Sequence, residues 1–351
     1  MSSAAEIKQA IYSLAEISGG SRLLQSLGRD NGKQVYILAY HRVDRPDHRP
    51  WLNPELISAM PAQFVQQMAL LRREYQPVTI GEIIEAASGG KKLPRHAVLV
   101  TVDDGYQDFQ ETILPACNEF GIRPLLFIPT KYVGQGTFWW DKLYQMIYLS
   151  GWKAIETADG ERVSIANPED KQGILQRLSR AFKNSDMKLG LEWLDELYVQ
   201  YLEREIPDTQ KDSHSTLDWD ELRSVSRHGA DVAAHTHSHF ILSRISAELI
   251  SQEIRQSKAM IQSELGEVLP VFAYPDGLAE AISLEARSIV REEGIQLAFT
   301  MVARRADLQQ DPHEYLPRLG TWPRLNLGHF HLRLTPTFSL IQSYRSGTLS
   351  K

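Results

Sequence analysis

Short apolar runs alternate with helical patterns along most of this chain, and this alternation restricts its fold more than any other feature. Six runs of five or six residues have the composition of buried strands: VYILAY (35–40), AVLVTV (97–102), PLLFIP (124–129), ADVAA (230–234), PVFAY (270–274) and LAFTM (297–301). Segments with helical spacing lie between them, at 61–75, 107–120, 219–228, 246–265 and 284–294. Buried strands that alternate with helices form βαβ units and a mainly parallel sheet, either open or closed into a barrel.

The alternation breaks between about 135 and 215. There FWWDKLYQMIYLSG and DMKLGLEWLDELYVQYLEREI have helical patterns with no strong strand between them. We therefore expect a helical insertion within one α/β catalytic domain spanning 35–325, rather than a second domain. Apolar residues at helical spacing predict an N-terminal helical extension over 1–34, and 326–351 are expected to be a C-terminal tail.

Composition excludes several classes of function. Asp and Glu outnumber Lys and Arg by 44 to 38, and no long basic run is present, so nucleic acid is not an expected partner. No window approaches the roughly 18 consecutive apolar residues of a membrane span. The first twenty residues lack the apolar core and basic start of a secretory signal. A single cysteine, Cys117, is typical of a reducing compartment, and together these features predict a cytoplasmic location.

Polar residues gather where the predicted strands end. His41 follows the first run, Asp103 and Asp104 end the second, HTHSH (235–239) follows the fourth, and PDG (275–277) follows the fifth. In parallel α/β folds, functional groups collect on the loops beyond the carboxyl ends of the strands. We therefore expect these clusters to share one site.

The adjacent carboxylates Asp103 and Asp104 repel each other and lose hydration at the end of a buried strand, unless a cation faces them. His235 and His239 are four residues apart, so they lie on one side if the chain turns helically there. With one Asp they make a two-histidine, one-carboxylate metal site with open positions. The other Asp is then placed to act as a general base on bound water. His237 is expected to point away from this site.

These residues also carry a family resemblance. TVDDG (101–105) and HTHSH resemble the first two motifs of the polysaccharide deacetylases (carbohydrate esterase family 4, the NodB-homology fold), T-F-D-D-G and H-[ST]-x-x-H. YHRV (40–43) and FAYPDG (272–277) resemble the subgroup that includes poly-N-acetylglucosamine deacetylases. The resemblance covers about 35–320. It implies a distorted (β/α) barrel that hydrolyses the N-acetyl group of a sugar, an oligosaccharide or a glycan precursor and releases acetate.

Residue roles follow from the same resemblance. Asp103 matches the catalytic base. Asp104, His235 and His239 match the ligands of a divalent metal, usually zinc. In the subgroup with an early Tyr-His motif that histidine is the general acid, which points to His41.

The sequence departs from the common family pattern in two places. The usual third motif, R-P-P-Y-G, supplies an arginine that orients the catalytic aspartate, whereas AYPDG places Ala273 at the arginine position and Asp276 at the tyrosine position. Arg318, in LPRLG, is a candidate for the missing charge, and a backbone N–H near Asp276 is expected to bind the oxyanion. The usual C-terminal L-x-H is weakly represented by Leu327 and His329, so His329 is the alternative acid.

Four aromatic residues lie near the proposed active face: Tyr40, Tyr106, Tyr274 and Trp322. Each is a candidate for stacking on a sugar ring, although buried aromatic residues are more often core residues. Trp139 and Trp140 are expected to dock the insertion on the barrel. Asp44, Asp47 and His48 are interpreted as ordinary loop residues.

Three other functions remain open at the level of sequence. A metal-dependent amidohydrolase uses an H-x-H motif, which His235 and His237 could supply, although its later ligands have no clear counterpart. A two-histidine, one-carboxylate site could hold ferrous iron in an oxygenase, which leaves the second Asp unexplained. A non-catalytic carbohydrate binder on the same scaffold is favoured by the altered third motif, whereas the complete Asp-Asp and His-His set argues against it.

Overall fold

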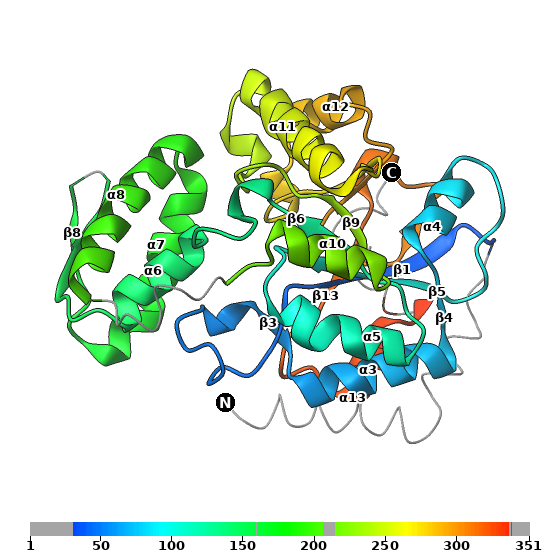
Figure 1. The fold of residues 1–351 in the computed structure, drawn as a ribbon, viewed down its shortest axis with the longest axis horizontal. Helices are drawn as coiled ribbons and strands as arrows, with labels where there is room; N and C mark the ends of the chain where they lie inside the picture. The colour runs from blue at the N-terminus through cyan, green and yellow to red at the C-terminus, as the bar shows by residue number, and fades with distance from the viewer. Residues whose placement is uncertain (1–30, 159, 206–214, 337, 339–351) are drawn as a thin grey trace.

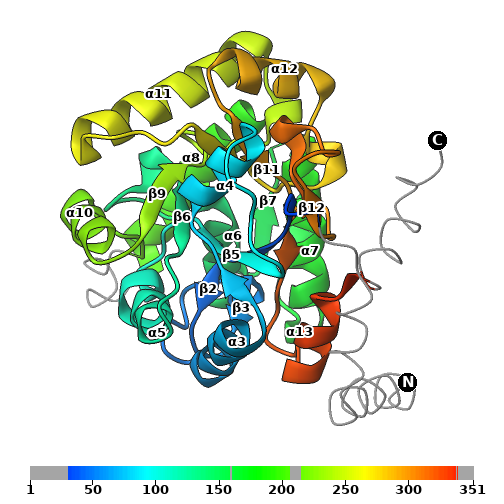
Figure 2. The same cartoon turned by 90° about the vertical axis from the view of Figure 1, so that its right-hand side faces the viewer.

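The computed structural model describes residues 31–158, 160–205, 215–336 and 338. Within these residues the chain forms a central sheet that curls into part of a barrel and is covered by helices (Figures 1 and 2). The predicted N-terminal helical extension, 1–34, lies outside the described residues except for its last four. In the described part, no helix has both the length and the apolar character needed to span a bilayer.

All six predicted strands are present in the central sheet. They are β1 (Gln34–Tyr40), β5 (Ala97–Asp103), β6 (Leu125–Ile128), β9 (Asp231–Ala234), β10 (Val271–Ala273) and β11 (Leu297–Phe299). Their order is β11-β10-β9-β6-β5-β1, and each neighbouring pair is parallel. The predicted α/β class and distorted (β/α) barrel are therefore confirmed.

Short strands that the sequence did not predict complete the structure. Three belong to the central sheet: β4 (Gln76–Pro77) beside β5, and β12 (Ala306–Asp307) and β13 (Leu319–Gly320) beside β1. A separate parallel pair is formed by β2 (Arg42–Val43) and β3 (Ile57–Ala59). Two or three residues carry too little periodic signal to be recognised in a sequence. β13 matters for function because it begins directly after Arg318 and pairs with β1.

The two faces of the central strands pack against different apolar clusters. On β1, Tyr36 and Leu38 belong to one cluster, whereas Val35 and Ile37 belong to the other. Burial on both faces explains why these strands are continuous apolar runs rather than alternating ones. Cys117 is fully buried in the first cluster, and burial raises the pKa of its thiol, as expected for an inert core residue.

The register of the sheet aligns the ends of its strands. Tyr40 on β1 pairs with Val102 on β5, and Asp103 pairs with Phe127 on β6. The residue after Tyr40, His41, therefore leaves the sheet at the level of Asp103. Parallel pairing brings these carboxyl ends to one edge, which is where the site forms.

Helices occupy the connections where helical spacing predicted them. They are α3 (Pro61–Glu74), α5 (Leu114–Glu119) with the π-helical turn η2 (Phe109–Ile113) before it, α10 (Trp219–Arg227), α11 (Ala247–Leu265) and α12 (Leu284–Glu292). The side chain of Ser246 caps α11 by accepting a hydrogen bond from the N–H of Leu249 at 3.3 Å. The helix α4 (Ile80–Ala87) was not predicted.

Two segments outside the barrel core differ in detail from expectation. Part of the predicted tail forms α13 (Leu327–Arg333), which packs against α3 and buries Phe330. The insertion contains the two predicted helices, α6 (Trp139–Tyr148) and α8 (Met187–Glu205), and lies to one side of the barrel (Figure 1). It also contains α7 (Lys171–Asn184) and a short hairpin of β7 (Ala154–Glu156) and β8 (Arg162–Ser164), which the sequence did not predict. Each hairpin strand buries one side chain, Ile155 or Val163, which leaves almost no apolar pattern in the sequence.

Candidate active site

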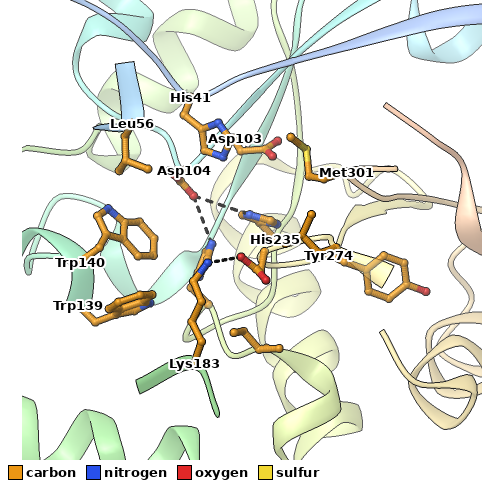
Figure 3. Close-up of a pocket in the computed structure, with 14 residues that line it drawn as sticks. His41, Leu56, Asp103, Asp104, Trp139, Trp140, Lys183, His235, Tyr274 and Met301 are labelled. Atoms are coloured by element: carbon orange, nitrogen blue, oxygen red, sulfur yellow. Dashed lines mark hydrogen bonds and ion pairs between the residues drawn. The ribbon is translucent and has the colours of Figure 1, made fainter. Parts of the chain in front are cut away.

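Three predicted metal ligands converge at the carboxyl edge of the sheet. One ligand atom from each of Asp104, His235 and His239 lies within 4.8 Å of the other two, and all three residues are buried. The Nε2 atoms of His235 and His239 are 3.7 and 3.4 Å from Oδ1 of Asp104 (Figure 3). The loops after β5 and β9 therefore bring together residues more than 130 positions apart in the chain.

The hydrogen bonds around this cluster suit a cation. Nδ1 of His235 lies 2.7 Å from the carbonyl oxygen of Ala273, which can only accept, so Nδ1 carries the proton and Nε2 presents a lone pair to the cluster. Oδ1 of Asp104 is buried and makes no hydrogen bond to any residue that the structure describes. An unsatisfied carboxylate oxygen in this position is costly, and a metal ion bound between the three side chains would satisfy it. The residues present therefore fit a divalent metal.

The ionisation states also suit metal binding. Burial, together with the neighbouring His239, lowers the pKa of His235 to about 4, so its imidazole is neutral near pH 7. Burial opposes ionisation of Asp104, but the imidazoles of His239 and His41 outweigh it and lower its pKa. A neutral imidazole and an ionised carboxylate are the forms that bind a metal ion.

The backbone around the site is strained. Of the five non-glycine residues with positive φ in the described part of the chain, four belong to this site: Asp104 (77°), Thr236 (65°), His239 (57°) and Asp276 (61°). A left-handed conformation costs an L-residue roughly 1 to 2 kcal/mol, and such strain concentrates at functional sites. The hydroxyl of Thr236 accepts a hydrogen bond from the N–H of His239 at 2.9 Å. This bond stabilises the turn that directs the rings of His235 and His239 toward Asp104.

Asp103, the predicted general base, is held by Arg318. The guanidinium donates to both carboxylate oxygens, at 2.8 and 2.7 Å, and also to Oγ1 of Thr101 and the carbonyl of Thr300. Arg318 is fully buried. Burial raises the pKa of Asp103, but Arg318 and His235 together lower it to about 2, so the carboxylate stays ionised in one orientation. Arg318, the residue before β13, thus supplies the positive charge that the family pattern expects from the position of Ala273.

Of the two candidate acids, the structure brings only His41 to the site. His41 lines the same cavity as Asp103 and Asp104, and its backbone N–H donates to Oγ of Ser58 at 2.9 Å. His329 lies on α13, where its ring packs edge-on against Trp322 with centroids 5.8 Å apart. In the part of the chain that the structure describes, the cavity wall includes His41 and not His329.

A cavity of about 280 Å³ opens above the cluster. This volume lies just below the roughly 300–1,000 Å³ range of ligand pockets, so the cavity accommodates a small group such as one sugar unit. Leu56, Trp139, Trp140, Tyr274 and Met301 form part of its wall (Figure 3). The two tryptophans come from α6, so the insertion both docks on the barrel and walls the site. The ring of Trp140 packs edge-on against that of His239 with centroids 4.8 Å apart.

Most of the aromatic candidates do not reach the cavity. Tyr40 shares its face of β1 with Tyr36 and Leu38, and it is buried with its hydroxyl donating to Gln67 at 2.8 Å. The prediction of Tyr40 as a substrate contact is therefore corrected to a core role, because alternation along the strand turns it toward α3. Tyr274 does line the cavity, and its hydroxyl donates to the carbonyl of Glu314 at 2.9 Å.

Tyr106 and Trp322 also lie elsewhere. The hydroxyl of Tyr106 donates to Asp141 at 2.7 Å and accepts from the indole N–H of Trp140 at 2.7 Å, so it joins the barrel to the insertion. Trp322 packs beneath the guanidinium of Arg333, 4.6 Å from its ring centroid. Neither is among the described residues of the cavity wall.

The histidine loop is supported from behind. The ring nitrogens of His237 contact Oγ1 of Thr130 at 2.9 Å and the side-chain amide of Gln256 at 3.0 Å, so this histidine points away from the cluster, as expected. Glu253 on α11 accepts hydrogen bonds from the N–H groups of His237 and Ser238, at 2.9 and 2.6 Å. Sequence reasoning missed Glu253, although an acidic residue on the apolar face of α11 was the available signal.

Comparison with known proteins identifies the family. Residues 90–298, more than half of the chain, match the family model described as polysaccharide deacetylase. The chain belongs to the polysaccharide deacetylase family. The resemblance seen in the sequence is therefore confirmed.

Individual relatives agree with this assignment. The poly-β-1,6-N-acetyl-D-glucosamine N-deacetylase of Escherichia coli K12 is 36% identical over 113 residues, and the match covers 29% of this chain but only 16% of that relative. The Streptococcus pyogenes deacetylase PplD, solved in complex with acetate, aligns over 86% of this chain and 99% of its own, with a TM-score of 0.57 and 16% identity. IcaB from Ammonifex degensii aligns over 86% and 97%, with a TM-score of 0.55 and 18% identity. At these identities the two structures establish a shared fold.

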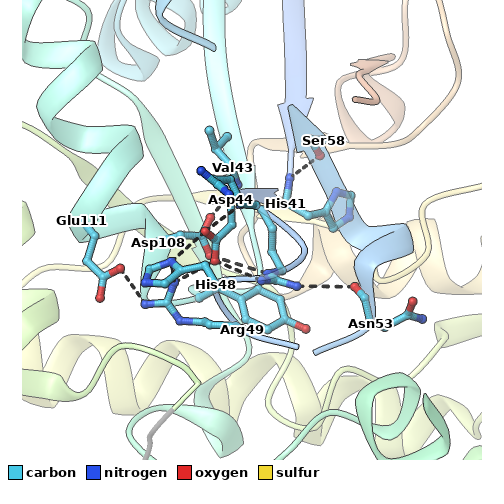
Figure 4. A network of polar contacts seen from close by, with 12 residues as sticks. His41, Val43, Asp44, His48, Arg49, Asn53, Ser58, Asp108 and Glu111 are labelled. Atoms are coloured by element: carbon cyan, nitrogen blue, oxygen red, sulfur yellow. Dashed lines mark hydrogen bonds and ion pairs between the residues drawn. The ribbon is translucent and has the colours of Figure 1, made fainter. Parts of the chain in front are cut away.

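In this deacetylase-family chain a buried charge network lies behind His41 (Figure 4). Arg42 is fully buried, with Nη2 3.2 Å from Oδ2 of Asp44 and Nε 3.8 Å from Oδ1 of Asp108. Arg49 connects Asp44 to Glu111, at 2.8 and 2.6 Å. Asp44 is thus part of a buried network rather than an ordinary loop residue.

The same network contains a carboxyl group that favours its protonated form. Asp108 is buried and accepts the backbone N–H of Val43 at 2.5 Å. Burial raises the pKa of Asp108 from 3.8 to about 6, although Arg42 opposes the change. The folded state therefore holds a proton that the unfolded chain releases, and stability falls as the pH rises from about 4 through 6.

We expect Asp108→Asn to remove this pH dependence. The amide keeps an acceptor for Val43 but cannot ionise, so between pH 4 and pH 7 the wild type should lose about 2 kcal/mol of unfolding free energy relative to the variant. Urea unfolding across this range measures the difference. Asp47→Asn, which changes an exposed aspartate on the loop after β2, is the control. A wild-type-minus-variant difference that does not change with pH would contradict the prediction.

Proposed function

We propose that this chain hydrolyses the N-acetyl amide of a hexosamine unit in a sugar, an oligosaccharide or a glycan precursor, releasing acetate and a free amine. The observation that carries the proposal is the meeting, in one cavity, of the Asp104, His235 and His239 cluster with the arginine-paired Asp103 and with His41. Membership of the polysaccharide deacetylase family and the activity named for the Escherichia coli relative support the choice of substrate.

The proposed cofactor is a divalent metal, most consistent with zinc, because two imidazoles and one carboxylate are a common catalytic zinc set. Bound by Asp104, His235 and His239, it would supply Lewis-acid polarisation of the acetamide carbonyl and of the attacking water. The three ligands contribute one negative charge and leave the cavity side of the cluster open to substrate. The residues around these three ligands then carry out the proton transfers.

Asp103 is the proposed general base. Its carboxylate lines the cavity beside Asp104, and the two-point contact with Arg318 fixes its direction and keeps it ionised. As the water attacks, Asp103 accepts its proton. The metal would be one group that contacts the oxyanion. We assign the other contact to a backbone N–H near Asp276, whose loop lines the cavity.

His41 is the proposed general acid. The amine cannot leave as an anion, because an amide anion is far too basic, so a proton must reach the nitrogen as the carbon–nitrogen bond breaks. Histidine changes charge near neutral pH and is suited to this step. His41 enters the cavity from β1, whereas the proposed ligands enter from the loops after β5 and β9 (Figure 3).

The geometry does not favour the amidohydrolase alternative. An H-x-H metal site would require the ring of His237 to join that of His235. The structure instead commits both ring nitrogens of His237 to Thr130 and Gln256. The oxygenase alternative gives no role to Asp103, whereas hydrolysis uses its carboxylate as a base.

The first test concerns the metal. Purified protein should contain close to one divalent metal ion per chain, and His235→Ala or His239→Ala should remove most of it because each deletes a ligand. His237→Ala should keep the metal and serves as the matched control. Elemental analysis after dialysis gives the result, and full metal retention in both ligand variants would refute the site.

The second test separates the adjacent carboxylates. Asp104→Asn should lose metal affinity and activity together. Asp103→Asn should retain the metal while kcat falls by roughly two to four orders of magnitude, since it removes the base. Metal content and acetate release from N-acetylglucosamine oligosaccharides are measured on the same preparations. The opposite pattern, with metal lost from the Asp103 variant and kept by the Asp104 variant, would exchange the two roles.

The third test concerns the proton donor. His41→Ala should fold and retain metal but lose kcat on amide substrates by roughly two orders of magnitude or more. An activated ester such as 4-nitrophenyl acetate has a leaving group that needs no proton, so its hydrolysis should fall much less. His329→Ala, outside the cavity, is the control. If His329→Ala abolishes amide hydrolysis and His41→Ala does not, the C-terminal histidine is the acid.

A further inference from the structure

Two residues that the common family motifs do not supply meet inside the cavity. One is Asp276, which stands at the tyrosine position of the third motif. The other is Lys183, which comes from α7 in the insertion and was not predicted from the sequence. The ammonium group of Lys183 forms an ion pair with Oδ1 of Asp276, and both residues line the cavity (Figure 3).

Asp276 is held in place independently of this ion pair. It follows β10 with φ of 61°, and the next residue, Gly277, has φ of 65°. A Cβ at Gly277 would lie 2.8 Å from Cγ of Met301, so the backbone is tightly confined there. The loop therefore presents the Asp276 carboxylate to the cavity whether or not a cation faces it.

Lys183 is also positioned by its neighbours. The ring of Phe182 stacks on that of Trp139 with centroids 4.6 Å apart and planes 21° apart, which ties α7 to the cavity wall. On the other side, Oδ1 of Asn184 accepts a hydrogen bond from Arg244 at 2.9 Å, which ties α7 to the barrel. The helix is therefore docked by contacts on both sides of Lys183.

Stability alone does not account for the pair. The side chains of Lys183 and Asp276 are 38% and 16% exposed, and ion pairs this accessible contribute only about 0.2 to 1 kcal/mol. That gain does not exceed the roughly 1 to 2 kcal/mol cost of the left-handed backbone at Asp276. Strained backbone concentrates at functional sites, and a strained residue whose charged side chain faces a ligand cavity is typical of a ligand-binding residue.

We propose that Lys183 and Asp276 together bind two hydroxyl groups of the sugar whose acetamide reaches Asp103, and that the insertion thereby sets substrate specificity. Lys183 offers hydrogen-bond donors and Asp276 offers carboxylate oxygens as acceptors, while each sugar hydroxyl can both donate and accept. The indole of Trp139 beside them provides an apolar surface for a ring face. This inference rests on the proposed deacetylase function and adds the residues that select the substrate.

The charges of the cavity indicate an uncharged sugar. Among the described residues of the cavity wall, Lys183 is the one lysine or arginine, and Asp276 already compensates its charge. A phosphate or carboxylate on the substrate beside Lys183 would meet an ammonium group that is already paired, and it would lie against the carboxylate of Asp276. The ligand class is therefore a neutral N-acetylhexosamine unit rather than a nucleotide sugar.

Binding to an inactive protein tests the pair without requiring turnover. In metal-loaded Asp103→Asn protein, adding Lys183→Met or Asp276→Asn should weaken the affinity for a β-1,6-linked N-acetylglucosamine oligosaccharide about tenfold or more, as measured by calorimetry. Asn184→Ala removes the docking contact next to Lys183 without touching the cavity and is the matched control. Equal weakening by Asn184→Ala would show that the pair acts through docking and would overturn the inference, as would unchanged affinity in both pair variants.

Kinetics in the otherwise wild-type protein separate this inference from the proposed function. Lys183→Met should raise KM for the oligosaccharide about tenfold with a much smaller change in kcat, so kcat/KM for the oligosaccharide should fall relative to kcat/KM for 4-nitrophenyl acetate. Wild-type protein that binds the oligosaccharide but releases no acetate would refute the proposed function and leave the sugar site standing. Tighter binding of UDP-N-acetylglucosamine than of the neutral oligosaccharide would overturn the assignment of the ligand class.

Discussion

Two carboxylates at the end of one buried strand must each be compensated, and the site is built around the two ways in which this is done. Arg318 compensates Asp103 with two charge-assisted hydrogen bonds inside the protein. Asp104 faces two imidazoles and retains a buried oxygen without a hydrogen bond in the described part of the chain, which suits a cation. One repulsive pair thus becomes a base and a ligand, because neighbouring residues supply positive charge to each side in a different form.

The loops around these carboxylates contain strained backbone, which lowers stability but orients the side chains of the site. Left-handed backbone at Asp104, Thr236 and His239 is unfavourable, and it persists because the surroundings hold it. Thr236 closes the histidine turn, and Glu253 on α11 accepts two N–H groups of the same loop. A rigid parallel sheet below and a helix behind therefore fix the directions of side chains that a free loop would not hold.

Residues from elsewhere in the chain, including the insertion, lie against the positions where the third motif departs from the family pattern. The position of Ala273 no longer provides a charge, yet Arg318 reaches the same carboxylate from the start of β13. Asp276 meets Lys183 from α7, and Trp140 from α6 covers the ring of His239. Loss of one motif residue is therefore compensated from the residue before a distant strand, and the altered third motif faces a cavity wall that the insertion supplies.

The sequence by itself determined the elements and the chemistry: six buried strands, the helices between them, and Asp103, Asp104, His235 and His239 at strand ends, since hydrophobic period and residue type are local properties. It also suggested His41 and Arg318 as candidates, but it could not choose His41 over His329 or show that Arg318 reaches Asp103. Those outcomes depend on register and on β13, a strand of two residues with no periodic signal. Only tertiary packing decided the core position of Tyr40, the ion pair of Lys183 with Asp276 and the hairpin in the insertion. The face of a strand that is buried, and the partner of a surface lysine, depend on residues far away in the chain.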